Sequence, residues 1–190
     1  MNFLAEKIVK MLLRTPHGLN WTVQGLGMLR AYIDDNKEIR LHIWDKDLIV
    51  PEVSTIHTHP WEFTSYIISG EILDTKLVES KSEFGQPYFK QSILCGEGGG
   101  LEGEPELVHL INKGGVLYRR GEQYCLWPDE IHDSQFKDGT VTIIQRKFGE
   151  DVDHAYVYWD EGEVWGSAEP RPAAKGEIER ACNKALESWG

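Results

Sequence analysis

Two histidines one residue apart, His57 and His59, end a short apolar run in the stretch 56–70, IHTHPWEFTSYIISG. Side chains at positions i and i+2 of a β-strand project to the same side, so both imidazoles can reach one metal ion without backbone strain. Pro60 has no amide hydrogen to donate to a sheet, which predicts that the strand ends there. Because imidazole nitrogen binds divalent transition metals, the pair predicts part of a metal site.

Short strands must position these histidines. From Trp21 onward the chain consists of short runs of β-branched and aromatic residues separated by turn residues, such as those at 34–36 and 137–139. This succession favours an antiparallel sandwich or barrel over alternating βαβ units. The expected strands are 27–33, 38–45, 53–59, 63–69, 71–79, 88–94, 106–111, 115–119, 123–126, 131–136, 140–147 and 154–159.

Both ends of the chain show helical spacing. Apolar residues recur at three- and four-residue steps, which predicts one helix within residues 1–15 and another over 172–189, packed outside the β-structure of residues 25–160. The glycine-rich, acidic segment 96–105 predicts an exposed loop. No linker rich in proline and serine divides the 190 residues, so we expect a single domain over 1–190.

Two stretches resemble the conserved motifs of the cupin superfamily. The first is His57-Thr-His59 followed by Gly70, and the second runs from Gly121 to His132, eleven residues later. The resemblance implies an all-β fold, a cupin-type double-stranded β-helix (jelly-roll barrel), with the two helices flanking it. It also implies that His132 joins the first two histidines at the mouth of the barrel.

The expected ligand set departs from the usual cupin pattern. The position of the family's glutamate ligand is Phe63 here, and Glu62, one residue away, is a candidate fourth ligand that a regular strand would point to the opposite face. Three neutral imidazoles bind Fe(II), Zn(II), Ni(II), Mn(II) or Cu(II) and leave positions open for water or substrate. The chain has no CxxC pair, which disfavours a purely structural zinc site.

A closer resemblance suggests an activity. The run from Ser54 to His59, followed by Gly70-Glu-Ile-Leu-Asp-Thr, is similar to the metal strand of cysteine-dioxygenase-like thiol oxygenases. That group uses three histidines and an upstream arginine, here Arg30, on the substrate carboxylate. The likeness implies a non-haem Fe(II) dioxygenase-type enzyme acting on a small molecule. A metal-dependent sugar or keto-acid isomerase or epimerase, and a cupin that binds a small ligand without turnover, are the alternatives.

Other residues are candidates for the same pocket. Counting by twos from His59 puts Phe63, Ser65 and Ile67 on the inner face, so that Ser65 is a polar group between apolar walls. Arg30 and Arg146 are flanked by apolar residues. A buried cation needs an anionic partner, so one of them is a candidate to hold a substrate carboxylate, the alternative being a surface position or an internal salt bridge.

The remaining histidines and tryptophans have simpler interpretations. His42, His109 and His154 have no companion at metal-binding spacing and are read as structural. Trp61 and Trp127 flank the ligand histidines of the two motifs and are candidates to line the mouth of the site.

Composition excludes several classes of function. The net charge of -11, from 31 acidic and 20 basic residues, disfavours nucleic acid and anionic membrane surfaces as partners. The apolar stretch 8–13 is far shorter than the roughly 20 residues of a membrane span. Three unrelated cysteines and no secretory leader predict reduced thiols in a cytoplasmic protein. Exposed strand edges and terminal helices favour a homodimer.

Overall fold

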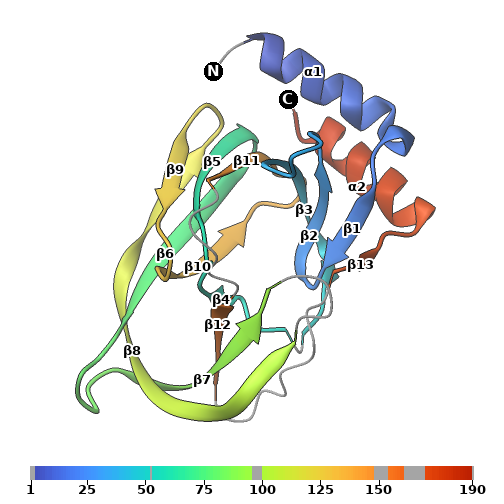
Figure 1. Ribbon diagram of the computed structural model, residues 1–190. Coiled ribbons are helices and arrows are strands. Elements are labelled where there is room, and N and C mark those ends of the chain that lie inside the picture. The colour runs from blue at the N-terminus through green and yellow to red at the C-terminus, as the bar shows by residue number, and fades with distance from the viewer. Residues whose placement is uncertain (1–2, 52, 96–99, 148–153, 161–169, 190) are drawn as a thin grey trace.

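Two antiparallel β-sheets form most of the protein, with one helix at each end of the chain (Figure 1). The structure is a computed structural model that describes residues 3–51, 53–95, 100–147, 154–160 and 170–189. The elements are α1 (Phe3–Arg14), a 3-10 turn (Pro16–Gly18), β1 (Trp21–Gln24), β2 (Leu26–Tyr32), β3 (Ile39–Ile49), β4 (Ile56–His57), β5 (Glu62–Ser69), β6 (Glu71–Glu79), β7 (Gln86–Leu94), β8 (Leu101–Arg119), β9 (Gln123–Leu126), β10 (Ile131–Phe136), β11 (Val141–Lys147), β12 (His154–Trp159), β13 (Arg171–Pro172) and α2 (Lys175–Glu187).

The order of the strands is that of a jelly roll. The first sheet runs β13-β1-β2-β3-β11-β5-β9, and the second runs β10-β4-β12-β7-β8-β6, with β6 pairing back onto β10. The central strands interleave as β3-β11-β5-β9 in one sheet and β4-β10-β6-β8 in the other. This is the two-Greek-key order of an eight-stranded jelly roll, so the predicted fold class is confirmed.

The helices cover the outer face of the first sheet, beside β1 to β3 (Figure 1). The predicted apolar stripe of α2 is buried there. In α1 the buried stripe differs from the expected one, because Leu4, Ile8 and Met11 are exposed and Val9 and Leu13 face the sheet instead. The buried helical residues are Val9 and Leu13 of α1 and Ala181, Cys182 and Ala185 of α2. No helix in the described parts of the chain is long and apolar enough to cross a lipid bilayer.

A second apolar cluster fills the space between the sheets. Phe63 and Ile67 of β5 belong to it, and Ser65 between them is also buried, so the predicted inner face of this strand is confirmed. Gly70, at φ +75°, then turns the chain from β5 into β6. A Cβ at this position would lie 2.9 Å from the backbone Cα of Thr140, which only glycine avoids.

The long strand β8 differs from the expectation. Residues 106–111 and 115–119 belong to one continuous strand, and residues 101–105, expected in a loop, begin it. Residues 96–99 lie outside the described residues. The register against β7 shifts between Lys90 and Ser92, and Gly103 opposite this shift has φ +72°. The resulting irregularity accommodates glycine and proline within a strand.

Two further expectations need correction at the edges of the sheets. The predicted strand 53–59 is shorter in the structure, where only Ile56 and His57 form a strand. A turn precedes this strand and Pro60 follows it, which leaves few residues for strand pairing. Strands β1 and β13 were not expected. They pair with each other at the edge of the first sheet.

Candidate metal centre

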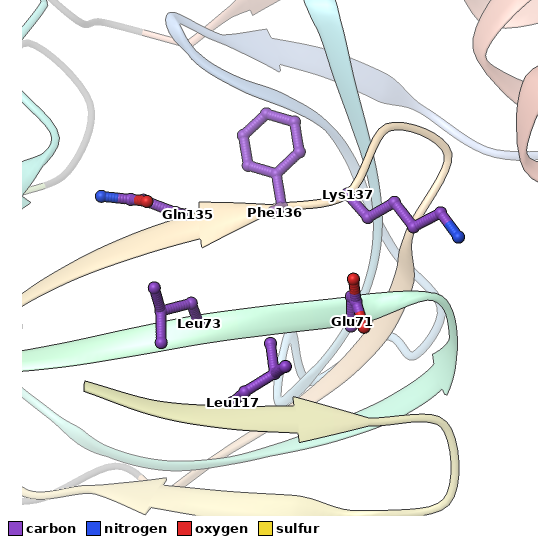
Figure 2. A pocket seen from close by; sticks show the side chains of 6 residues that line it. All are labelled: Glu71, Leu73, Leu117, Gln135, Phe136 and Lys137. Carbon is purple, nitrogen blue, oxygen red and sulfur yellow. The ribbon is translucent and has the colours of Figure 1, made fainter.

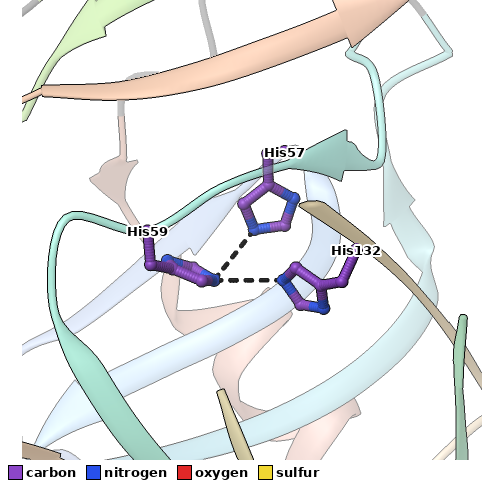
Figure 3. A group of neighbouring side chains, drawn as sticks. All are labelled: His57, His59 and His132. Carbon is purple, nitrogen blue, oxygen red and sulfur yellow. Dashed lines mark hydrogen bonds between the residues drawn. The ribbon is translucent and has the colours of Figure 1, made fainter. Parts of the chain in front are cut away.

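Three imidazoles meet inside the mouth of the barrel. His57 closes β4, His59 follows it, and His132 on β10 lies directly opposite His57 in the ladder. The Nε2 atom of His59 is 3.1 Å from Nε2 of His57 and 3.2 Å from Nε2 of His132. Figure 3 shows the ring of His59 joined by dashed lines to the two other rings. The structure thus brings together the three histidines that the two motifs singled out.

Hydrogen bonds on the far side of two rings fix where their protons lie. Nδ1 of His57 donates to the carbonyl of Thr55, and Nδ1 of His132 donates to the carboxylate of Asp74, each over 2.8 Å. Because both oxygens only accept, each neutral ring keeps a lone pair on Nε2. Those lone pairs face the Nε2 of His59, which has at most one proton to donate. The arrangement leaves nitrogen lone pairs directed at one point, as a bound cation requires.

The electrostatics keep the rings of His57 and His59 neutral and ready to bind a metal. Burial, followed by the neighbouring His132, lowers the pKa of His57 to about 3. Burial and the other two imidazoles lower the pKa of His59 well below its usual value. A metal with bonds of about 2.0–2.1 Å to nitrogen separates neighbouring ligand atoms by about 2.8–3.4 Å, depending on geometry. The two measured separations fall in that range, so the residues fit a divalent transition metal.

The residue between the first two histidines anchors them to the neighbouring strand. Thr58 is 2% exposed, and its backbone N–H donates to the carbonyl of Tyr156 on β12 over 2.8 Å. Its hydroxyl accepts from the backbone N–H of Tyr156 over 2.9 Å. This pair of bonds holds the segment that carries both ligands after the short strand β4 has ended.

Two aromatic rings, those of Trp61 and Phe63, lie against one side of the candidate centre. The indole of Trp61 stacks on His59 at 4.6 Å between centroids, and Phe63 meets the same imidazole edge-on at 5.0 Å. Glu62 does not join the group. Its carboxylate accepts from Lys147 Nζ over 2.6 Å, as expected for a side chain on the opposite face of β5. Among described residues, the close group of potential ligands consists of the three histidines.

The arginines singled out in the sequence lie on the inner face of the first sheet. Arg30 on β2 donates to Thr22 and to Gln24, at 3.3 and 3.1 Å. Arg146 on β11 pairs across the ladder with Phe63, and its guanidinium lies 5.0 Å from the centre of the Trp61 ring. Burial, then the charge of Arg40, lowers the pKa of both arginines to about 10.

Sequence reasoning missed two residues of this face. Arg40 is 8% exposed and lies 5.1 Å from the centre of the Trp61 ring, and His42, read as structural, is 6% exposed two positions later on β3. The alternation of Arg40, His42 and Trp44 with Leu41 and Ile43 puts these three on one face of the strand, but it does not show which face is turned inward.

The other candidates divide between interior and surface. Ser65 is 1% exposed and lies opposite Tyr124 in the ladder of β5 and β9. Trp61 contacts the centre, whereas the side chain of Trp127 is 60% exposed. Of the two tryptophans expected at the mouth, Trp61 therefore makes the ring contact with a candidate ligand, His59.

A separate hollow of about 320 Å³ opens on neighbouring strands of the second sheet (Figure 2). It lies at the end of β10 opposite to His132 and includes none of the three histidines. Its lining residues are Glu71, Leu73, Leu117, Gln135, Phe136 and Lys137.

Comparisons with known proteins add little beyond this geometry. No protein-family model and no curated protein matches the chain. It is similar to a solved structure of hydroquinone 1,2-dioxygenase PnpCD in complex with Cd2+ and 4-hydroxybenzonitrile, at 19% identity and a TM-score of 0.34, over 66% of this chain and 60% of that one. It is also similar to procruciferin, an 11S globulin from Brassica napus, at 11% identity and a TM-score of 0.34, over 81% and 34% of the two chains. These weak likenesses carry no argument, and the strand order and the three histidines identify a jelly-roll protein with a candidate divalent-metal site.

Proposed function

We propose that this protein is a metal-dependent cupin enzyme, a non-haem Fe(II) dioxygenase-type catalyst acting on a small molecule. The observation that carries the proposal is the convergence of three Nε2 atoms from two strands, two of them with their proton held on the opposite ring nitrogen. A structural site is usually closed by four protein ligands, and here the described ligand group has three.

The metal would be held by His57, His59 and His132. When bound, ferrous iron would supply the one-electron chemistry that dioxygen needs to react with a closed-shell organic substrate. Zn(II), Mn(II) or Ni(II) fits the same nitrogen donors and would instead favour polarisation of a carbonyl, as in an isomerase or epimerase.

The chain's own residues would bind and orient the substrate. Trp61 and Phe63 contact His59 and keep water away from that side of the centre. We assign substrate binding to Arg30 and Arg146, whose guanidiniums lie on the inner face of the first sheet. Ser65, buried on the same face, would donate a hydrogen bond to the substrate.

Metal content is the first test. Purified protein is stripped with a chelator, reconstituted anaerobically with Fe(II), Zn(II), Mn(II) or Ni(II), desalted and measured by elemental analysis. We expect about one metal ion per chain for the wild type, and loss of that metal in His132→Ala. The control is His17→Ala, because the side chain of His17 is 58% exposed and outside the centre.

Oxygen uptake is the second test. The iron-loaded protein is screened with thiols and small carboxylates in an oxygen electrode. Uptake that depends on iron and on His132 supports a dioxygenase. Turnover of a sugar or keto acid with zinc or manganese and no oxygen uptake identifies an isomerase. A protein that holds no metal and keeps its stability and ligand binding in His57→Ala contradicts the proposal and favours a binding protein without turnover.

A further inference from the structure

Three arginines and one histidine face one another beside the metal centre. Across the ladder of β2 and β3, Arg30 lies opposite His42, and Tyr32 lies opposite Arg40. Arg146 comes from β11, on the other side of β3, and its guanidinium and that of Arg40 lie 5.3 and 4.8 Å from the centre of the Tyr32 ring. Three strands thus direct positive charge to one region of the inner face.

Neutral groups hold two of these cations, Arg30 and Arg40, in place. Arg40 donates to the hydroxyl of Tyr32 over 2.6 Å, and Arg30 donates to the side chains of Thr22 and Gln24. Within the described chain, no carboxylate lies at ion-pair distance from Arg30 or Arg40, although the protein carries 31 acidic residues. A buried charge without a counter-charge is costly, so it is retained where a ligand supplies the partner.

Two side chains offer unused hydrogen-bonding atoms in the same region. The Nε atom of Arg40 and both ring nitrogens of His42 are buried and have no hydrogen-bond partner among the residues that the structure describes. Burial and the neighbouring arginines lower the pKa of His42 well below its usual value, so the ring is neutral and has one N–H to donate. Native proteins rarely leave several buried polar atoms unpaired in one place, which points to a ligand rather than to a packing defect.

One aromatic ring connects this region to the metal centre. The indole of Trp61 stacks on His59 and also meets the guanidiniums of Arg40 and Arg146, at 5.1 and 5.0 Å from its centre. The arginines therefore lie only one side chain away from the candidate metal ligands.

We propose that Arg30, Arg40 and Arg146, with the N–H of His42, bind a doubly negative group of the substrate, either a phosphomonoester or a dicarboxylate. This inference rests on the proposed function, because it assigns the substrate class of the same site. A single carboxylate is satisfied by one bidentate guanidinium, whereas three cations complement an anion with two charges. The substrate is therefore distinguished by its charge, and a zwitterionic amino acid with one carboxylate is a poor match.

Anion binding to metal-free protein tests this without turnover. Full-length protein stripped by a chelator is titrated calorimetrically with inorganic phosphate, malonate or acetate at constant ionic strength. Removing the metal ensures that the anions report on the arginines. We expect phosphate or malonate to bind at least about tenfold more tightly than acetate, and the preferred one of the two identifies the phosphate or the dicarboxylate class.

Arg40→Gln is the decisive variant, and Arg119→Gln is its control because the side chain of Arg119 is 65% exposed on the other sheet. Arg40→Gln should weaken dianion binding at least about tenfold, and Arg119→Gln should leave it unchanged. Without ligand, Arg40→Gln should melt no lower than wild type, since it removes an uncompensated buried charge. A purely structural arginine would give the reverse, namely a lower melting temperature with unchanged anion binding.

Each result has one interpretation. Equal affinity for acetate and the dianions, or equal dianion affinity in Arg40→Gln and wild type, overturns the inference even if the histidines bind metal. A dianion preference that depends on Arg40 in a protein that never retains metal supports the anion site and overturns the proposed function.

Discussion

Replacing Asp74 by asparagine isolates the charge behind the third candidate ligand. The carboxylate accepts from His132 Nδ1 over 2.8 Å, and an amide oxygen in its place can still accept that hydrogen bond. The variant therefore keeps the orientation of the ring but makes its Nε2 a weaker donor to a metal. We expect Asp74→Asn to lower metal affinity while leaving the fold intact.

The size of the effect follows from the burial of the pair. His132 and Asp74 are 3% and 2% exposed, so solvent does not replace the lost charge, and we expect the upper part of the usual 10- to 100-fold loss of affinity, about 100-fold. With free metal at about 100 times the wild-type Kd, binding stabilises the wild type by about 2.7 kcal/mol and the variant by about 0.4 kcal/mol. At about 2–4 °C per kcal/mol for a domain of this size, the metal-induced rise in Tm falls from about 5–11 °C to about 1–2 °C.

The assay is a thermal melt with and without metal, together with a competitive chelator titration for Kd. Asp129→Asn is the matched control, because this exposed aspartate three residues before His132 has φ +62°, a conformation that asparagine tolerates. Equal metal-induced shifts in wild type and both variants would refute the argument that Asp74 tunes a metal ligand.

Two further predictions concern the scaffold and are checked by chemical denaturation. Gly70→Ala should destabilise the protein by about 2–5 kcal/mol, since it adds a contact with the backbone of Thr140 to the cost of a positive φ, whereas Gly121→Ala, at φ +90° with open space around it, should cost only about 1–2 kcal/mol. Equal losses would show that the close approach to Thr140 is unimportant. Leu13→Ala should cost about 2–4 kcal/mol, because this side chain is 2% exposed, and Met11→Ala, at 59% exposed, less than about 0.5 kcal/mol. A small loss for Leu13→Ala would contradict the packing of α1 on the sheet.

The convergence of the histidines was predictable because their spacing in the sequence determines the direction in which the rings project. An HxH pair presents both rings to one side whatever the rest of the fold does, and the second motif ends on the strand that lies beside them. The inner face of β5 was predictable for the same reason, because side chains two residues apart share one face of a strand. This rule placed Phe63 inward and Glu62 outward.

Residues that depend on long-range pairing were beyond such reasoning. Arg40 faces the site because β3 pairs with β11, about a hundred residues later, and an isolated strand does not reveal which of its faces is covered. Asp74 reaches His132 across 58 residues for the same reason. At the start of β8, glycines and Pro105 suggested a loop, but pairing with β7 outweighed these local preferences.

The bonds between Thr58 and Tyr156 make β12 a remote reporter of the metal centre. Thr58 lies between the candidate ligands His57 and His59, and its hydroxyl accepts a hydrogen bond from the backbone N–H of Tyr156. The position of both histidines therefore depends on this backbone amide. Local opening of β12 would break the two hydrogen bonds that hold Thr58, and the segment that carries the first two imidazoles would lose this anchor. Occupancy of the centre should therefore slow amide hydrogen exchange at Tyr156, although this tyrosine contributes no ligand atom to the three-histidine group.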